Sequence, residues 1–149
     1  MLAAARADVI IAEFDAINIG SAADVDGNAS DWIELRNSGS AGVSLNGWAL
    51  SDDPGIPGKW VFPNVSIGGL AQLRVFASAK NRSIASVELH TNFKLSGDGE
   101  YLGVYGREAD GSPYLDYVEF PLQTADVSWS LVGEAWGADN TPTPGAANE

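Results

Sequence analysis

The chain has 149 residues, of which 45% are hydrophobic and 19% are charged, so it is long and apolar enough for one packed domain and is not a disordered chain. It has no cysteine and one histidine, which excludes disulfide frameworks, thiol nucleophiles and zinc sites built on thiolates. The net charge of −12 is opposite to what a phosphate-binding surface requires, and no apolar run reaches 18 residues. We therefore expect no nucleic-acid partner and no membrane insertion.

Short apolar runs separated by turn-forming residues predict strands along the whole chain. In the second of these runs, Ile33 and Leu35 alternate with Trp32, Glu34 and Arg36, as in a strand with one buried face. The predicted strands cover residues 9–14, 32–37, 43–50, 59–62, 72–77, 100–105, 114–120 and 127–132.

Turn signals accompany most of these strands, as in Asn46-Gly47 and Asp98-Gly99. The runs at 100–105 and 114–120 are typical of a hairpin closed by the loop at 106–113. No window of 11 residues or more has an apolar stripe with helical spacing. Because only two packed sheets can bury so many half-apolar strands, we expect an all-β fold, an antiparallel sandwich or a small barrel.

Six blocks of sequence carry a resemblance to a known family. They are residues 30–37 (SDWIELRN), 43–53 (VSLNGWALSDD), 59–63 (KWVFP), 89–95 (LHTNFKL), 99–102 (GEYL) and 142–148 (PTPGAAN). In this order they resemble the lamin-tail domain family, and in detail the bacterial members found in secreted or cell-surface multidomain proteins. The resemblance implies an immunoglobulin-like β-sandwich, in agreement with the strand pattern.

The chain is expected to divide into three parts. Residues 1–8 are a disordered or trimmed start, with an Ala-x-Ala pattern like that of signal-peptide cleavage sites but too short an apolar run before it. Residues 9–140 form the lamin-tail-like domain. Residues 141–149 are rich in proline and poor in apolar residues, which is typical of an extension or linker. These features and the resemblance predict a secreted or cell-surface module, cut from a longer protein.

An acidic loop at residues 24–31 is a candidate calcium site. Asp24, Asp26 and Asn28 place side-chain oxygens at alternating positions, and a backbone carbonyl near Ser30 and the carboxylate of Asp31 complete the predicted ligands. The positions at which an EF-hand needs Gly and Glu hold Ala and Leu, so an EF-hand is excluded. The alternative is an Asx-rich turn without an ion. Repulsion between the acids favours a cation.

No catalytic constellation is evident. His90 stands alone, and no Gly-x-Ser-x-Gly elbow is present, so we expect a structural histidine and no enzyme. An enzyme would need a cleft that joins His90 to an acid and a serine. The five Trp and four Tyr residues are expected mainly in the core, and the alternative for any of them is a platform for a ligand.

Together these observations favour a non-catalytic immunoglobulin-like binding or adhesion module of a larger bacterial extracellular or cell-surface protein, stiffened by calcium if the loop binds it. Its expected partners are other domains of the same polypeptide and a protein or polysaccharide ligand. The alternative is a carbohydrate-binding accessory module of a secreted hydrolase. A row of exposed aromatic residues on one sheet face would support that alternative, and aromatic residues that all point inward would remove it.

Overall fold

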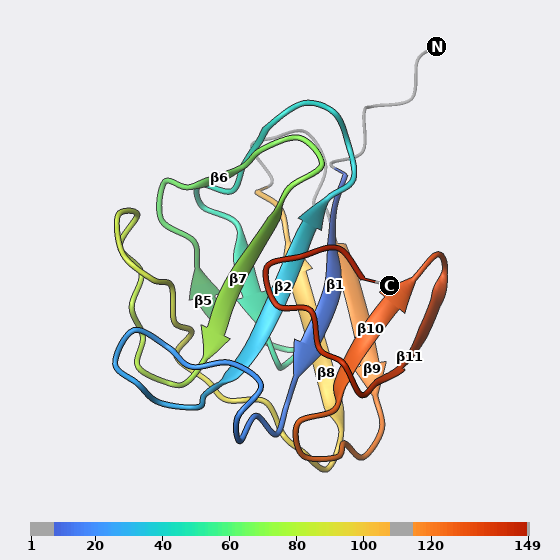
Figure 1. Ribbon diagram of the computed structural model, residues 1–149. Helices are drawn as coiled ribbons and strands as arrows, with labels where there is room; N and C mark the ends of the chain where they lie inside the picture. Colours follow the sequence, from blue (N-terminus) through green and yellow to red (C-terminus); the bar gives the residue numbers. More distant parts are fainter. Residues whose placement is uncertain (1–7, 108–114, 149) are drawn as a thin grey trace.

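The computed structural model describes residues 8–107 and 115–148 (Figure 1), so most of the predicted N-terminal start lies outside the described residues. The strands are β1 (Val9–Asp15), β2 (Asp31–Asn37), β3 (Val43–Ser44), β4 (Ala49–Ser51), β5 (Trp60–Val61), β6 (Ser66–Ile67), β7 (Gln72–Ala77), β8 (Glu100–Tyr105), β9 (Leu115–Phe120), β10 (Ser128–Val132) and β11 (Ala135–Asp139). None of the described residues is helical, and thus no helix that could cross a membrane occurs among them.

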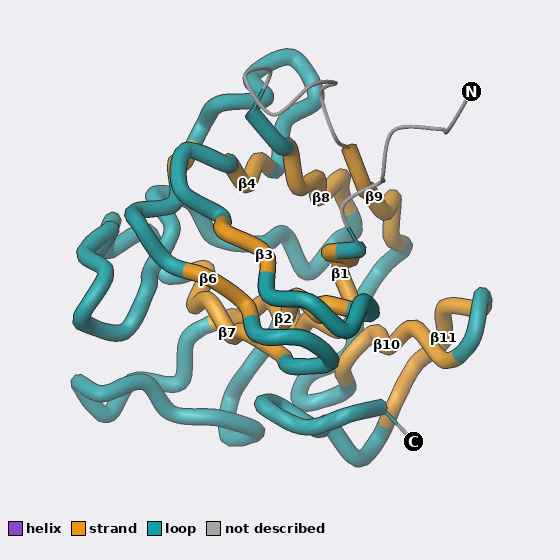
Figure 2. Tube along the Cα trace, turned by 90° about the horizontal axis from the view of Figure 1, so that it is seen from above, coloured by secondary structure: helices purple, strands orange, loops and turns teal. Residues whose placement is uncertain are grey.

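Two antiparallel sheets pack face to face, as the view from above shows (Figure 2). The five-stranded sheet has the order β11-β10-β1-β2-β7, and the four-stranded sheet has the order β5-β4-β8-β9. The short pair β3-β6 lies at one end of the sandwich. This arrangement confirms the predicted all-β, immunoglobulin-like antiparallel β-sandwich.

Strand boundaries follow the sequence pattern closely where the alternation is long. The strands at 72–77 and 100–105 have the predicted bounds, whereas the predicted strand at 43–50 is divided into β3 and β4. The division lies at Gly47, whose φ of +80° closes a turn in which the Trp48 N–H donates to the Leu45 carbonyl over 2.8 Å. Asn46 and Gly47 do form a turn, as predicted, and this turn divides the predicted strand at 43–50 into two.

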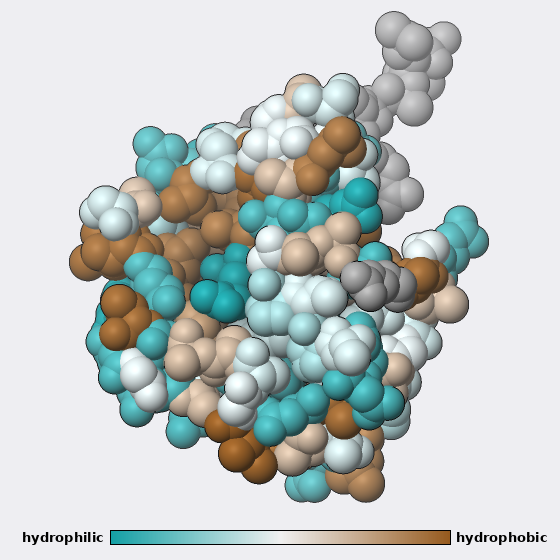
Figure 3. All heavy atoms as spheres, viewed as in Figure 1, coloured by the Kyte–Doolittle hydropathy of each residue, from teal (hydrophilic) through white to brown (hydrophobic). Residues whose placement is uncertain are grey.

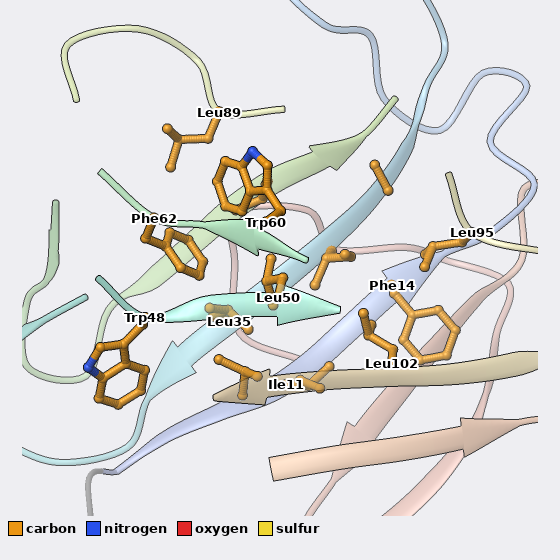
Figure 4. Close-up of a cluster of buried hydrophobic side chains, with 14 of the residues drawn as sticks. Ile11, Phe14, Leu35, Trp48, Leu50, Trp60, Phe62, Leu89, Leu95 and Leu102 are labelled. Carbon is orange, nitrogen blue, oxygen red and sulfur yellow. The ribbon is translucent and has the colours of Figure 1, made fainter. Parts of the chain in front are cut away.

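The core lies between the two sheets and is built from the inward positions of both. Members of this core that Figure 4 labels are Ile11, Phe14, Leu35, Trp48, Leu50, Trp60, Phe62, Leu89, Leu95 and Leu102. All five Phe residues and three of the five Trp residues are buried, and Trp129 and Trp136 are partly buried against the core. Most aromatic side chains therefore serve packing, as expected.

Residues 140–148, called here the C-terminal strap, cross the outer face of the five-stranded sheet (Figure 1). Glu13 accepts hydrogen bonds from the Thr143 N–H and Oγ1 at 3.0 and 2.9 Å, and Glu34 accepts one from the Gly145 N–H. At the end of the strap, Asn148 Nδ2 donates to the Ala12 carbonyl of β1 and to the Leu131 carbonyl of β10. Hydrophilic and weakly polar residues cover the middle of this face (Figure 3). The segment expected to be an extension thus lies against the sheet.

Candidate functional site

Three tyrosines lie on the outer face of the four-stranded sheet. Tyr101 and Tyr105 come from β8 and Tyr117 comes from β9. The rings of Tyr101 and Tyr117 are stacked, with centroids 5.7 Å apart and planes inclined by 23°, and the hydroxyls of Tyr101 and Tyr105 are hydrogen-bonded at 2.5 Å. Tyr117 is 56% exposed. We call this cluster the tyrosine face.

The local sequence explains why the rings lie together. Residues 101, 103 and 105 alternate to the outer face, while Leu102 and Val104 enter the core. Gly103 stands opposite Tyr117, and a Cβ at Gly103 would lie 2.6 Å from the Tyr101 hydroxyl and 3.0 Å from two ring carbons. The ring of Tyr101 therefore occupies space that only a glycine leaves free.

The electrostatics of the tyrosine face suit a neutral hydrogen-bonding surface. Burial raises the pKa of Tyr101, and the hydrogen bond with Tyr105 raises it further, so the phenol stays protonated at physiological pH. Exposed ring faces bind C–H groups, and the adjacent hydroxyls can donate or accept hydrogen bonds. Val61 of the edge strand β5 is 47% exposed and lies in the same cross-strand row as Tyr105, with Ala49 of β4 between them.

The acidic loop folds around a lysine. The Lys80 Nζ lies 2.6 Å from Asp24 Oδ2, 2.8 Å from Asp26 Oδ2 and 2.9 Å from Asn28 Oδ1. Arg82 Nη2 adds a second ion pair to Asp26 at 2.9 Å. Three of the predicted calcium ligands therefore do converge, and a side-chain ammonium lies among their oxygens.

The other two predicted ligands have different positions. The Ser30 carbonyl accepts from Asn18 Nδ2 at 2.7 Å, and the Ser30 Oγ donates to Asp24 Oδ2 at 3.1 Å. Asp31 accepts from the Leu95 N–H at 3.2 Å and is not among the oxygens around Lys80. Burial raises the pKa of Asp31 to about 6, although backbone N–H donors oppose the shift. In residues 8–107 and 115–148, no three His, Asp or Glu side chains are grouped so as to hold a metal ion. Calcium binding stays a prediction.

Hydrogen bonds fix the shape of the loop. Asp24 Oδ1 accepts from the N–H groups of Asp26 and Asn28 at 3.0 and 2.9 Å, and Gly27 takes a φ of +84°. Burial acts to raise the pKa of Asp24, but hydrogen bonds from Lys80, the Asn28 N–H and the Ser30 hydroxyl outweigh it and lower the pKa to about 2. The hydrogen bond from Lys80 also lowers the pKa of Asp26. The repulsion between the acids is thus offset within the chain.

His90 has polar partners that sequence reasoning did not find, and Arg82 Nη1, 3.4 Å from its Nε2, is the most distant of them. Its Nδ1 lies 2.7 Å from the Ser78 Oγ, and its Nε2 lies 2.9 Å from Glu88 Oε1. The imidazole is completely buried and stacks on Phe76. Glu88 Oε1 also accepts from the Val25 N–H at 2.9 Å, so the cluster ties the acidic loop to the segment around His90.

A family model for the lamin-tail domain matches residues 3–117, which is more than three quarters of the chain. The chain belongs to the lamin-tail domain family. No curated protein matches the sequence, so the family model alone carries this assignment. The matched part of this lamin-tail domain contains the acidic loop, His90 and the tyrosine face, while β10, β11 and the C-terminal strap lie outside it.

Family membership bears on the serine, histidine and acid around His90. Lamin-tail domains are an immunoglobulin-like, non-catalytic family. A nucleophilic serine is usually held by a histidine that an acid orients from the other ring nitrogen, and Ser78, His90 and Glu88 do form such a chain. The imidazole, however, has no exposed surface, and Ser78 is only 8% exposed. In this lamin-tail domain the cluster satisfies buried polar groups and joins loops.

Sequence signals for the missed residues differ in strength. Tyr101, Gly103 and Tyr105 show a period-two pattern that already predicts one shared face. Lys80 and Arg82 show no comparable signal, because they lie more than fifty residues from the loop that they neutralise. Only the pairing of β2 with β7, in which Asp31 stands opposite Ala77, brings the two segments together.

Proposed function

We propose that this lamin-tail domain is a non-catalytic binding or adhesion module of a larger bacterial extracellular or cell-surface protein, and that it contacts its ligand through the tyrosine face. One observation carries the proposal: Tyr101, Tyr105 and Tyr117 gather on the outer face of one sheet, whereas all Phe residues are buried in the core. A stacked, partly exposed aromatic cluster is typical of a recognition surface.

The resemblance to secreted bacterial members of the family supports the location of the module. The charge of −12 and the closed core support a role in binding a neutral or basic partner. The other domains of the same polypeptide are the natural first partners of such a module.

The tyrosine face also favours the second candidate function, a carbohydrate-binding accessory module of a secreted hydrolase. A sugar ring presents an apolar C–H face that packs on an aromatic ring, with hydroxyls at its rim for hydrogen bonds. Tyr101 and Tyr117 offer two nearly parallel rings, and the hydroxyls of Tyr101 and Tyr105 lie beside them. Neutral polysaccharides fit the acidic chain better than acidic ones do.

The test is binding of the purified domain to an array of neutral and acidic glycans and to an array of peptides, each in millimolar calcium and in EDTA. The Tyr117→Ala variant removes the most exposed ring, and Ile19→Ala is a control that truncates another exposed side chain, 67% exposed, on a loop. We expect Tyr117→Ala to lose at least tenfold in affinity and Ile19→Ala to keep it.

Each outcome has a distinct meaning. Binding to neutral glycans that depends on Tyr117 supports the carbohydrate-binding function, and binding to peptides that depends on Tyr117 supports the protein-binding one. Binding that Tyr117→Ala leaves unchanged, or no binding to either array, contradicts the assignment of the ligand to the tyrosine face.

A further inference from the structure

The two large sheets have four edge strands, which are β11 and β7 in one sheet and β5 and β9 in the other. Other parts of the chain cover the edges of β7 and β5. The second half of β7 is covered by the segment at residues 89–91, with backbone hydrogen bonds to and from Phe76 of 2.9 and 2.8 Å. Its first half carries Gln72 and Arg74, which are polar or charged. The edge of β5 is capped by the Ser83 hydroxyl, which donates to the Val61 carbonyl at 2.9 Å. Such devices stop other strands from pairing with an edge.

The third edge strand, β9, is linked to β1 of the other sheet by one hydrogen bond. The Ile11 N–H of β1 donates to Asp116 Oδ2 of β9 at 2.8 Å, so a side chain bridges the two sheets there. β11 is different. Neither Figure 1 nor Figure 2 shows a neighbouring strand on its outer side, and no described residue outside β10 bonds to its backbone.

The register of the β10–β11 hairpin shows which backbone groups are open. Val132 pairs with Ala135 across a two-residue turn, so residues 135, 137 and 139 bond to β10, and the N–H and C=O groups of Trp136 and Ala138 point outward. The Leu131 carbonyl agrees with this register, because it points away from β11 and accepts a hydrogen bond from the strap at 2.7 Å. β11 thus presents two donors and two acceptors in the pattern that an added strand requires.

A hollow adjoins the open edge. It has a volume of about 270 Å³ and is lined by Val132, Ala135, Gly137 and Asp139, among others. A Cβ at Gly137 would meet nothing within 4 Å, so the missing side chain leaves the hollow open. On the opposite face of β11, Trp136 packs on Phe14 with ring centroids 5.7 Å apart, which anchors the strand to the core.

We propose that β11 is the docking edge for an extended peptide segment of a partner, which adds to the five-stranded sheet as a sixth strand. Main-chain hydrogen bonds to Trp136 and Ala138 hold the segment, and one of its apolar side chains enters the hollow over Gly137. Its basic residues face Glu134 and Asp139, which lie at the two ends of β11.

Charge selects this partner over a second copy of the chain. If two β11 strands paired antiparallel, the Glu134 end of each would lie near the Asp139 end of the other, and both copies carry a net charge of −12. The site is separate from the tyrosine face, which belongs to the other sheet. Failure of one proposal therefore leaves the other standing.

The experiment is selection from a displayed library of random ten-residue peptides against the purified domain. We expect enriched peptides with alternating apolar residues and with Lys or Arg near both ends. Their affinity should fall at least tenfold in Ala138→Pro, because proline removes one outward N–H without disturbing the bonds to β10. Gly137→Val, which fills the hollow, should weaken the peptides that place a large side chain there. Ile84→Ala, which truncates an exposed side chain next to the residue that caps β5 of the other sheet, is the control that should bind them normally.

The melting temperature of each variant shows whether it is folded, and Gly137→Val keeps the test valid if Ala138→Pro is not. No enrichment, or equal binding by the parent and both β11 variants, overturns the proposal. A dimer in light scattering that Ala138→Pro dissociates assigns the edge to a second copy and also overturns it. Binding that weakens with added salt and requires the basic residues supports it.

Discussion

Glu34 lies on the outer face of β2 beneath the C-terminal strap and is completely buried. Burial, helped by the facing Glu13 of β1, raises its pKa from the ordinary value of 4.5 to about 7, although the Gly145 N–H and Arg74 of β7 oppose the shift. The described part of the strap has no titratable side chain. The carboxyl therefore keeps its proton in the folded protein over a pH range in which the unfolded chain has lost it.

This difference sets the sign and the size of a pH effect. Because the folded pKa is raised, the stabilisation from protonated Glu34 is complete below pH 4.5 and is lost as the pH rises through about 7. The rise in pKa from 4.5 to about 7 corresponds to a difference in stability of about 3.4 kcal/mol at most, at 1.36 kcal/mol for each step of one in pKa. Solvent near the strap reduces the effect, so we expect a change of about 1.5 to 3 kcal/mol in the free energy of unfolding.

The perturbation is Glu34→Gln, which keeps the shape and the acceptor for the Gly145 N–H but cannot ionise. Urea unfolding followed by tryptophan fluorescence at pH 5 and pH 8 gives the free energies. We expect the variant to match the parent at pH 5 and to exceed it at pH 8 by about 1.5 to 3 kcal/mol. Glu119→Gln, an exposed position on β9, is the control and should follow the parent. If Glu34→Gln loses stability between pH 5 and pH 8 as steeply as the parent, the pKa of Glu34 is not raised in the folded protein.

Three further variants test the loop, the tyrosine face and the core. Lys80→Met leaves the buried Asp24 without its cation and should lower the midpoint of urea unfolding. If the loop binds calcium, this midpoint should be higher in millimolar calcium than in EDTA. A midpoint that calcium leaves unchanged in both the parent and the variant contradicts the calcium hypothesis. Gly103→Ala should displace the Tyr101 ring and abolish ligand binding, while the free energy of unfolding falls by less than about 1.5 kcal/mol. Unchanged binding would show that the Tyr101 ring does not need the space that Gly103 leaves free. Leu50→Ala, in the centre of the core, should cost about 2 to 5 kcal/mol in urea unfolding, and a smaller loss would contradict its place there.

The sandwich could be predicted because its longer strands alternate clearly. The two short or weakly patterned strands, β6 and β11, could not. β6 has two residues, and β11 is built from Ala, Trp, Gly, Ala and Asp, of which only Trp favours strands. β11 forms because its hairpin with β10 places Trp136 against Phe14, a long-range contact that no local pattern contains.

The acidic loop shows the same limit. Its oxygen ligands are close in sequence, so their convergence could be predicted from Asp24, Asp26 and Asn28 alone. The cation among them comes from Lys80, and the lysine arrives through the β2–β7 pairing. Repulsion among acids indicates that some cation is present, but repulsion alone does not distinguish an ammonium from an ion.

The open edge of β11 would be a hazard in most proteins, because unpaired strands recruit copies of themselves. Here Glu134 precedes β11 and Asp139 ends it, so self-pairing brings like charges together, while a basic peptide meets complementary charges. A single arrangement of acids can therefore oppose aggregation and select a partner. This dual role requires that replacing both acids by neutral amides should weaken the selected basic peptides and, at the same concentration, increase self-association.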